Sequence, residues 1–324
     1  MAGKRGRRII WFFLLAVVFL CPVSADADEF PQKPIHMIIT YSVGGGTDVL
    51  GRAFQRPFEE ALGTKIIVDN IPAGTTKIGT LEAIKAKPDG YTIILMPDSG
   101  WVTRYYSGTF DFKVYEKLTP LGNITSEPYG FVEVTVESPF KTWADLVKGA
   151  KARPGQLTCG GPGEGALNQA IMMQITKAAG ITTRYVPFAG AGPSKVALLG
   201  GHIDFRICQP TEAIAMVRAG KTRGLGVSTD IRMKAMPDVP TFKELGVGKV
   251  PPLTRSIWGP LNMDKKRADY ISKAIEKATK DPAFVRLIEE EFLYTVDYKP
   301  GKKLLEDLIA FDRQYGPMLA EVFK

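Results

Sequence analysis

The residues best suited to chemistry form a glycine-rich turn between an extended segment and a helical pattern. The run Pro34 to Thr40 is followed by Tyr41-Ser42-Val43-Gly44-Gly45-Gly46-Thr47-Asp48, where the helical pattern begins. Glycines let backbone N–H groups approach a ligand without interference from a Cβ atom, and the start of a helix favours negative charge. This pattern predicts that the turn binds a small anion, and we expect a carboxylate.

Two nucleotide-binding interpretations fit the sequence poorly. A dinucleotide fingerprint beginning at Gly44 needs a glycine at position 49, which is Val49. The string Gly220-Lys221-Thr222 has Ala215 where a phosphate-binding loop has its first glycine. We therefore expect no cofactor.

The side chains that usually carry out catalysis are not combined in a catalytic pattern. The two histidines, His36 and His202, have no His, Cys or acidic partner at metal-ligand spacing, and the chain lacks a Gly-x-Ser-x-Gly motif. The sequence predicts a binding protein, with neither an enzymatic function nor a metal.

The first residues are typical of an export signal. Basic residues from Lys4 to Arg8 precede the apolar run Ile9 to Leu20, and Val23-Ser24-Ala25 suits cleavage. The run is too short to span a bilayer, so we expect residues 1–25 to be removed and the mature protein to be periplasmic. Cys159 and Cys208 then remain, either as a disulfide or as two small buried residues.

The charge of the mature chain argues against a nucleic-acid partner. The formal net charge is +8, but four basic residues lie in the export signal, which leaves 38 basic against 34 acidic residues. These remaining charges are scattered along the chain, whereas a nucleic-acid surface gathers them on one face.

Short apolar segments alternate with amphipathic ones, which predicts an α/β fold with mostly parallel, doubly wound sheets. Strands are expected at 35–40, 65–69, 92–96, 130–136, 158–159, 183–186, 203–208 and 224–228. Helices are expected at 47–62, 78–86, 142–152, 166–179, 193–199, 212–219, 265–280, 282–291 and 301–322. Pro and Gly cluster at 127–134 and 246–260, so we expect a first domain of 26–128 plus 250–324 and an inserted second domain of 129–249.

Several motifs together resemble a known family. They are Tyr41 to Arg52, Val68-Asp69-Asn70, Pro88-Asp89-Gly90-Tyr91-Thr92, Val186-Pro187-Phe188, Leu199-Gly200-Gly201 with Asp204, Gly220-Lys221-Thr222-Arg223 and Pro237-Asp238-Val239-Pro240-Thr241. In order and spacing, the chain resembles the TctC-type, or Bug, solute-binding proteins of tripartite tricarboxylate transporters over nearly the whole mature sequence.

The resemblance implies a periplasmic binding protein-like two-domain clamshell, in which two loops hold a ligand carboxylate through backbone N–H groups and water. The first loop carries over to Tyr41, Gly44, Gly45, Gly46, Thr47 and Asp48, and the second to Gly163, Glu164, Gly165, Ala166 and Gln169. The family usually has Ser or Thr where Ala166 stands and His where Gln169 stands.

Individual side chains leave alternatives open. Asp48 either stabilises the start of its helix or orients the loop. Strand alternation places Asp204 and Arg206 on one face, so Arg206 either pairs with Asp204 or enters the cleft to bind a second carboxylate. Tyr41, Phe188 and Trp101 suit either an aromatic ligand wall or the core.

The resemblance implies a receptor that captures a small carboxylate and delivers it to the membrane permease of a tripartite tricarboxylate transporter, acting as a monomer. Alternatives are a carboxylate-sensing binding protein for a signalling partner and, with less support, an exported α/β hydrolase. The sequence does not identify the carboxylate.

Overall fold

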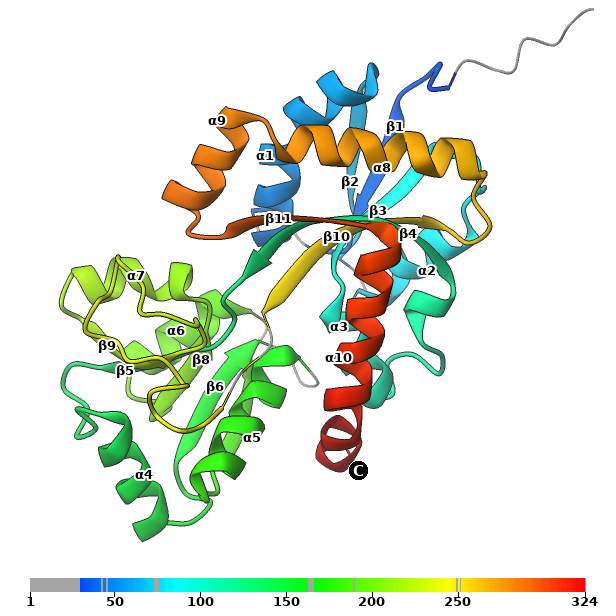
Figure 1. The fold of residues 1–324 in the computed structure, drawn as a ribbon. Coiled ribbons are helices and arrows are strands. Elements are labelled where there is room, and N and C mark those ends of the chain that lie inside the picture. The colour runs from blue at the N-terminus through cyan, green and yellow to red at the C-terminus, as the bar shows by residue number, and fades with distance from the viewer. Residues whose placement is uncertain are drawn as a thin grey trace, which may run out of the picture.

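The computed structural model describes residues 30–323 except 42, 45, 73–75, 163–165, 189, 249 and 251. The chain builds two β-sheets, each flanked by helices (Figure 1). We call the larger sheet with its helices the first lobe and the smaller sheet with its helices the second lobe. The expected export signal lies outside the described residues.

The first lobe contains a mixed sheet with strand order β11-β4-β10-β3-β1-β2. β1 is parallel to β2 and β3, whereas β10 is antiparallel to β3 and β4, and β11 is antiparallel to β4. Its strands are β1 (Ile35–Ile39), β2 (Ile66–Asn70), β3 (Thr92–Pro97), β4 (Leu118–Glu127), β10 (Leu253–Pro260) and β11 (Thr295–Pro300).

The second lobe contains a mixed sheet with strand order β7-β6-β8-β5-β9. β6 is parallel to β7 and β8, and β5 is antiparallel to β8 and β9. Its strands are β5 (Phe131–Thr135), β6 (Thr158–Pro162), β7 (Arg184–Phe188), β8 (Phe205–Cys208) and β9 (Thr222–Val227). The expected α/β class is confirmed, but both sheets are mixed rather than mostly parallel.

Helices cover both faces of the first sheet. The core between the sheet and α1 and α8 includes Met37, Phe54, Phe58 and Ile271, and the core on the opposite face includes Trp101, Trp258 and Leu308. The first-lobe helices are α1 (Gly46–Leu62), α2 (Lys77–Lys85), α3 (Ser99–Tyr106), α8 (Lys265–Thr279), α9 (Pro282–Arg286) and α10 (Gly301–Val322), with short turns at Val114–Glu116 and Leu287–Glu291.

Local sequence signals account for the helix boundaries in the second lobe. Thr142 and Asp145 form a capping box at the start of α4, and Gly180 ends α5 in the left-handed conformation at φ 61°. The helices are α4 (Trp143–Ala152), α5 (Leu167–Ala179), α6 (Ala191–Leu199) and α7 (Pro210–Arg218). Every segment predicted from the sequence has a counterpart here or in the first lobe, but β4, β10, β11 and α3 were not predicted.

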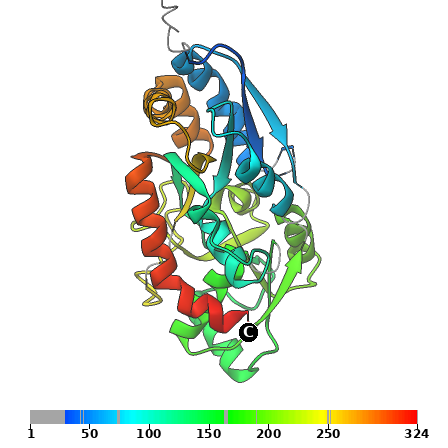
Figure 2. The same cartoon turned by 90° about the vertical axis from the view of Figure 1, so that its right-hand side faces the viewer.

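The two lobes are joined where β4 leads into β5 and where the chain returns from β9 to β10 (Figure 1). Helix α10 then runs along the side of the molecule opposite β1 and β2 and contacts α5 of the second lobe (Figure 2). No described helix has the length and apolar character required to cross a membrane.

Candidate ligand-binding site

The glycine-rich turn lies between the end of β1 and the start of α1. Gly44 adopts the left-handed conformation at φ 79°, which suits glycine, and its N–H donates a 2.8 Å hydrogen bond to the Asp48 carboxylate. Thr47 and Asp48 are buried, whereas Gly44 and Gly46 are exposed. Gly45 lies outside the described residues.

Asp48 orients this loop. Its carboxylate also accepts hydrogen bonds from Arg52 Nε at 3.0 Å and from Asn70 Nδ2 at 2.9 Å, and Asn70 Nδ2 donates to the Tyr41 carbonyl at 3.0 Å. Burial acts to raise the pKa of Asp48, but these hydrogen bonds outweigh burial and lower it. The carboxylate is therefore ionised and engaged within the loop, which favours its orienting role.

A buried arginine that sequence reasoning missed lies against the same loop. Arg255 on β10 donates to Thr47 Oγ1 at 3.2 Å, and its Nη2 lies 3.0 Å from where a Cβ atom on Gly46 would be. The guanidinium also pairs with Glu127 and lies 5.4 Å from the centre of the Tyr294 ring. Gly46 is thus a position where a larger residue would collide with a charged side chain.

The arginine belongs to a polar network that connects the two lobes. Glu127, at the end of β4, accepts a 3.1 Å hydrogen bond from Gln209 Nε2, just before α7 of the second lobe. Tyr294 OH donates to Gln209 Oε1 at 3.3 Å. Because Arg255 and Glu127 are far apart in the sequence, no local pattern indicated this network.

The second expected loop lies only partly within the described structure, because Gly163, Glu164 and Gly165 are outside it. Ala166 and Gln169 are half-buried at the start of α5, and the Ala166 side chain caps no backbone group. The neighbouring Asn168 fixes this end of the helix, since it accepts from Tyr129 OH at 2.6 Å and donates to the Ile207 carbonyl at 2.8 Å.

The aromatic residues divide between the core and half-buried positions. Trp101 is fully buried and meets Trp258 edge to face at 5.5 Å between ring centroids, so of the two alternatives for this residue the structure supports the core. Tyr41 is half-buried against the first-lobe cores, and Phe188 is half-buried beside Gly160 of β6.

Asp204 and Arg206 do not form the expected ion pair. The Asp204 carboxylate accepts from the Thr158 N–H at 2.7 Å and from its hydroxyl at 2.8 Å. Asp204 precedes β8, which runs parallel to β6, so it lies at the opposite end of these strands from the loop that follows β6. It is therefore at the end of β8 opposite Gln209, which contacts Glu127 of the first lobe.

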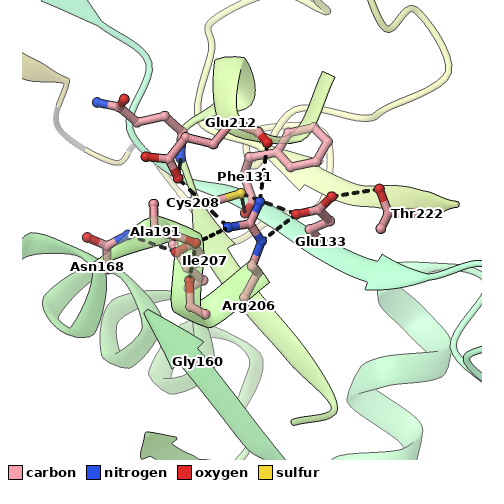
Figure 3. Close-up of polar contacts among 12 residues, drawn as sticks. Phe131, Glu133, Gly160, Asn168, Ala191, Arg206, Ile207, Cys208, Glu212 and Thr222 are labelled. Carbon is pink, nitrogen blue, oxygen red and sulfur yellow. Dashed lines mark hydrogen bonds and ion pairs between the residues drawn. The ribbon is translucent and has the colours of Figure 1, made fainter. Parts of the chain in front are cut away.

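Arg206 is fully buried inside the second lobe (Figure 3). Its Nε lies 2.5 Å from Glu133 on β5, and its other nitrogens donate to the Ala191 and Glu212 carbonyls at 3.2 and 3.4 Å. Glu133 also accepts a 2.6 Å hydrogen bond from Thr222. The guanidinium therefore connects the starts of α6 and α7 to the sheet, a role that the sequence did not predict, and its buried ion pair is with Glu133 rather than with Asp204.

The two cysteines are separate buried thiols. Cys159 and Cys208 are free, and burial raises the pKa of both side chains. Cys208 Sγ lies 3.6 Å from the Glu133 carboxylate. The described residues contain no cluster of His, Cys, Asp and Glu able to hold a metal ion.

Two lobes of mixed sheet, joined by two chain crossings, define a periplasmic binding protein-type fold. A TctC solute-binding protein from Polaromonas has 26% sequence identity to this chain and a TM-score of 0.74, covering 90% of this chain and 99% of that one. The periplasmic binding protein BugD superposes with a TM-score of 0.75 at 24% identity, covering 91% and 97% of the two chains.

The sequence comparisons identify the family. Residues 50–310 match the tripartite tricarboxylate transporter family receptor, and the chain belongs to this family. It is 33% identical to a UPF0065 protein of Cupriavidus necator over 94% of this chain and 88% of that protein. It is 29% identical to BugT of Bordetella pertussis over 86% and 85% of the two chains. The resemblance found in the sequence is confirmed, and the family and the two structural neighbours are solute-binding proteins rather than enzymes.

Proposed function

We propose that this chain is a periplasmic receptor that captures a small carboxylate between the loop at 41–48 and the loop at 163–169. The bound form is delivered to the membrane permease of a tripartite tricarboxylate transporter. In this proposal residues 1–25 direct export, 26–128 and 250–324 form one domain, 129–249 form the other, and the receptor acts as a monomer.

The observation that carries the proposal is the fixed geometry of the first loop. Asp48, Asn70 and Arg52 form a closed set of hydrogen bonds that holds the turn at Gly44. The first N–H groups of a helix have no partner within the helix, so the start of α1 can donate to an anion. The guanidinium of Arg255 also lies beside Gly46, but Glu127 compensates its charge, so the backbone N–H groups carry the proposal.

In this proposal a bound ligand closes the two lobes, because only in the closed form can it contact both loops at once. A carboxylate held by both loops stabilises the closed form relative to the open one and shifts the population toward it. The Gln209 side chain contacts Glu127 and Tyr294 across the lobes, so its hydrogen bonds are among the contacts that connect them.

Two fold neighbours suggest the first ligands to test. Rpa4515 of R. palustris, with adipate, has a TM-score of 0.79 at 21% identity, and MatC of Rhodopseudomonas palustris, with malate, has 0.72 at 21%.

Calorimetric titration of the mature protein with adipate, malate, citrate and a series of monocarboxylates tests the proposal. We expect saturable binding of at least one acid and a rise in melting temperature with it. Absence of binding across the series at millimolar concentrations contradicts the proposal.

Asp48→Asn tests whether the loop carries the binding. The variant loses the charge that holds Arg52 and the Gly44 N–H, so we expect at least tenfold weaker carboxylate binding. Asp145→Asn is the matched control, because it removes a capping carboxylate from α4 and leaves the loop unchanged. Equal affinity in both variants assigns the ligand to another site.

A further inference from the structure

We propose that a cavity behind the strands joining the lobes binds a small primary amine carried on an apolar body. This hinge-side cavity encloses about 280 Å³ between the end of β3, the strands β4 and β10, and α10. Its lining includes Asp98, Ser99, Asn123, Thr254, Lys299 and Leu308, none of which belongs to the two expected carboxylate loops.

Two buried polar atoms of residues that line the cavity have no partner among the described residues. They are Asn123 Oδ1 and Ser99 Oγ, and the two residues are 0% and 3% exposed. Asn123 Nδ2 donates to the Asp297 carbonyl at 2.7 Å and to the Thr125 carbonyl at 3.3 Å, which fixes the amide and leaves Oδ1 as an acceptor. Because an unsatisfied buried group costs about 1–3 kcal/mol, a ligand that donates to it gains affinity.

The charges around the cavity favour a cation over a carboxylate. The charged residues lining it are Asp98, Asp307 and Lys299. Lys299 Nζ lies 3.0 Å from Asp307 and 3.2 Å from Asp297, so nearby acids compensate its charge. The charge that remains is that of Asp98. When this side chain is ionised, it is negative and repels carboxylates, the ligands that we propose for the two loops.

The opposite wall of the cavity is apolar. Leu304, Leu308, Phe311 and Tyr315 lie on one face of α10, and the last two rings are 4.8 Å apart. Aromatic rings can pack against the body of a ligand and can also attract an ammonium group. The volume of the cavity limits the ligand to a small molecule, since pockets for drug-sized ligands begin at roughly 300 Å³.

Calorimetric titration with phenethylamine tests the site, with phenylacetate and 2-phenylethanol as matched probes of similar shape. We expect phenethylamine to bind in the cavity and 2-phenylethanol to bind there more weakly. Phenylacetate should bind in the cavity at least tenfold more weakly than phenethylamine. Ala310→Trp places a bulky side chain at an exposed position lining the cavity and is expected to weaken amine binding at least tenfold. Ala283→Trp, at an exposed position on α9, is the matched control.

Ser99→Ala is a second variant that removes one unpartnered hydroxyl, and we expect severalfold weaker amine binding with an intact fold. The proposal is overturned if phenethylamine does not bind, which would leave the cavity to water, or if Ala310→Trp binds it like the control. Asp48→Asn must leave amine binding unchanged. If it abolishes that binding, the amine occupies the carboxylate loops and the second site does not exist.

Discussion

At the residue scale, the guanidinium of Arg206 is a structural group. It is enclosed by Glu133 and by the carbonyls at the starts of α6 and α7, so its charge is used to hold elements together inside one lobe. A buried ion pair contributes little net stability by itself, but removing one partner leaves an uncompensated charge.

Replacing this guanidinium therefore affects folding more than ligand choice. Arg206→Met leaves Glu133 buried without its cation, and we expect a loss of about 3–5 kcal/mol in the free energy of unfolding, measured by urea denaturation. Arg232→Met is the control, because its pair with Glu244 is 46% exposed on each side and is worth less than about 1 kcal/mol. A stable Arg206→Met variant that loses only dicarboxylate binding would restore the ligand role.

A second prediction at this scale concerns Asp98 and pH. Burial raises its pKa to about 6 despite hydrogen bonds from Thr254, Ser256 and the Ser99 N–H, whereas an unfolded aspartate titrates near 4. Between pH 4 and pH 6, Asp98 is protonated in the folded protein but ionised in the unfolded chain. Its contribution to the free energy of unfolding therefore falls as the pH rises from 4 to 6 and is constant above that range.

Asp98→Asn removes this dependence. Urea denaturation at a series of pH values should show the variant gaining about 2 kcal/mol relative to the wild type between pH 4 and pH 6.5, before the fixed cost of the changed hydrogen bonds. Parallel stability curves for the two proteins would show that Asp98 does not titrate in this range.

At the scale of elements, local patterns predicted the segments that pack on their own neighbours in the sequence. In α1, Leu50, Phe54, Phe58 and Leu62 repeat every four residues, which buries one face. The strands β4 and β10 bury polar residues inside the sheet instead. Arg255 pairs with Glu127, and the Asn123 Nδ2 group donates to the Asp297 carbonyl. A local pattern does not show such partners, so the sequence does not predict these two strands.

The candidate site, too, could be predicted only where its residues are neighbours in the sequence. The loop at Gly44 and its anchor Asp48 are adjacent in sequence and were found together, whereas Arg255, Tyr294 and Gln209 reach the site only through the fold. Arg206 was placed correctly on a strand, but its partners come from other elements, so alternation alone selected the wrong neighbours.

The position of α5 gives a prediction for the second loop. Tyr129→Phe removes the hydroxyl that donates to Asn168 at the start of this helix, and we expect about 1 kcal/mol lower stability together with severalfold weaker carboxylate binding. Tyr106→Phe is the matched control, because it loses a similar hydrogen bond to Asp312 on α10. It should lose comparable stability and keep its affinity, and equal binding losses in both variants would argue against a positioning role for Tyr129.

At the scale of the whole molecule, the network between the lobes predicts a measurable change of shape. Gln209→Met removes the hydrogen bonds to Glu127 and Tyr294, so the unliganded variant should be more extended than the wild type in small-angle X-ray scattering. Saturating carboxylate should reduce the radius of gyration of both proteins. An identical radius with and without bound ligand would contradict closure of the lobes.

The strand order also fixes the sequence in which the lobes can be completed during synthesis. All strands of the second sheet, β5 to β9, are contiguous in the chain, so this lobe has every pairing partner once residue 227 has emerged. In the first sheet β4 lies between β10 and β11, which are made last. A chain that emerges N-terminus first, in synthesis or in export, can therefore fold its inserted half while the half that encloses it still has an open sheet edge. In this state a chaperone has an unpaired strand to protect.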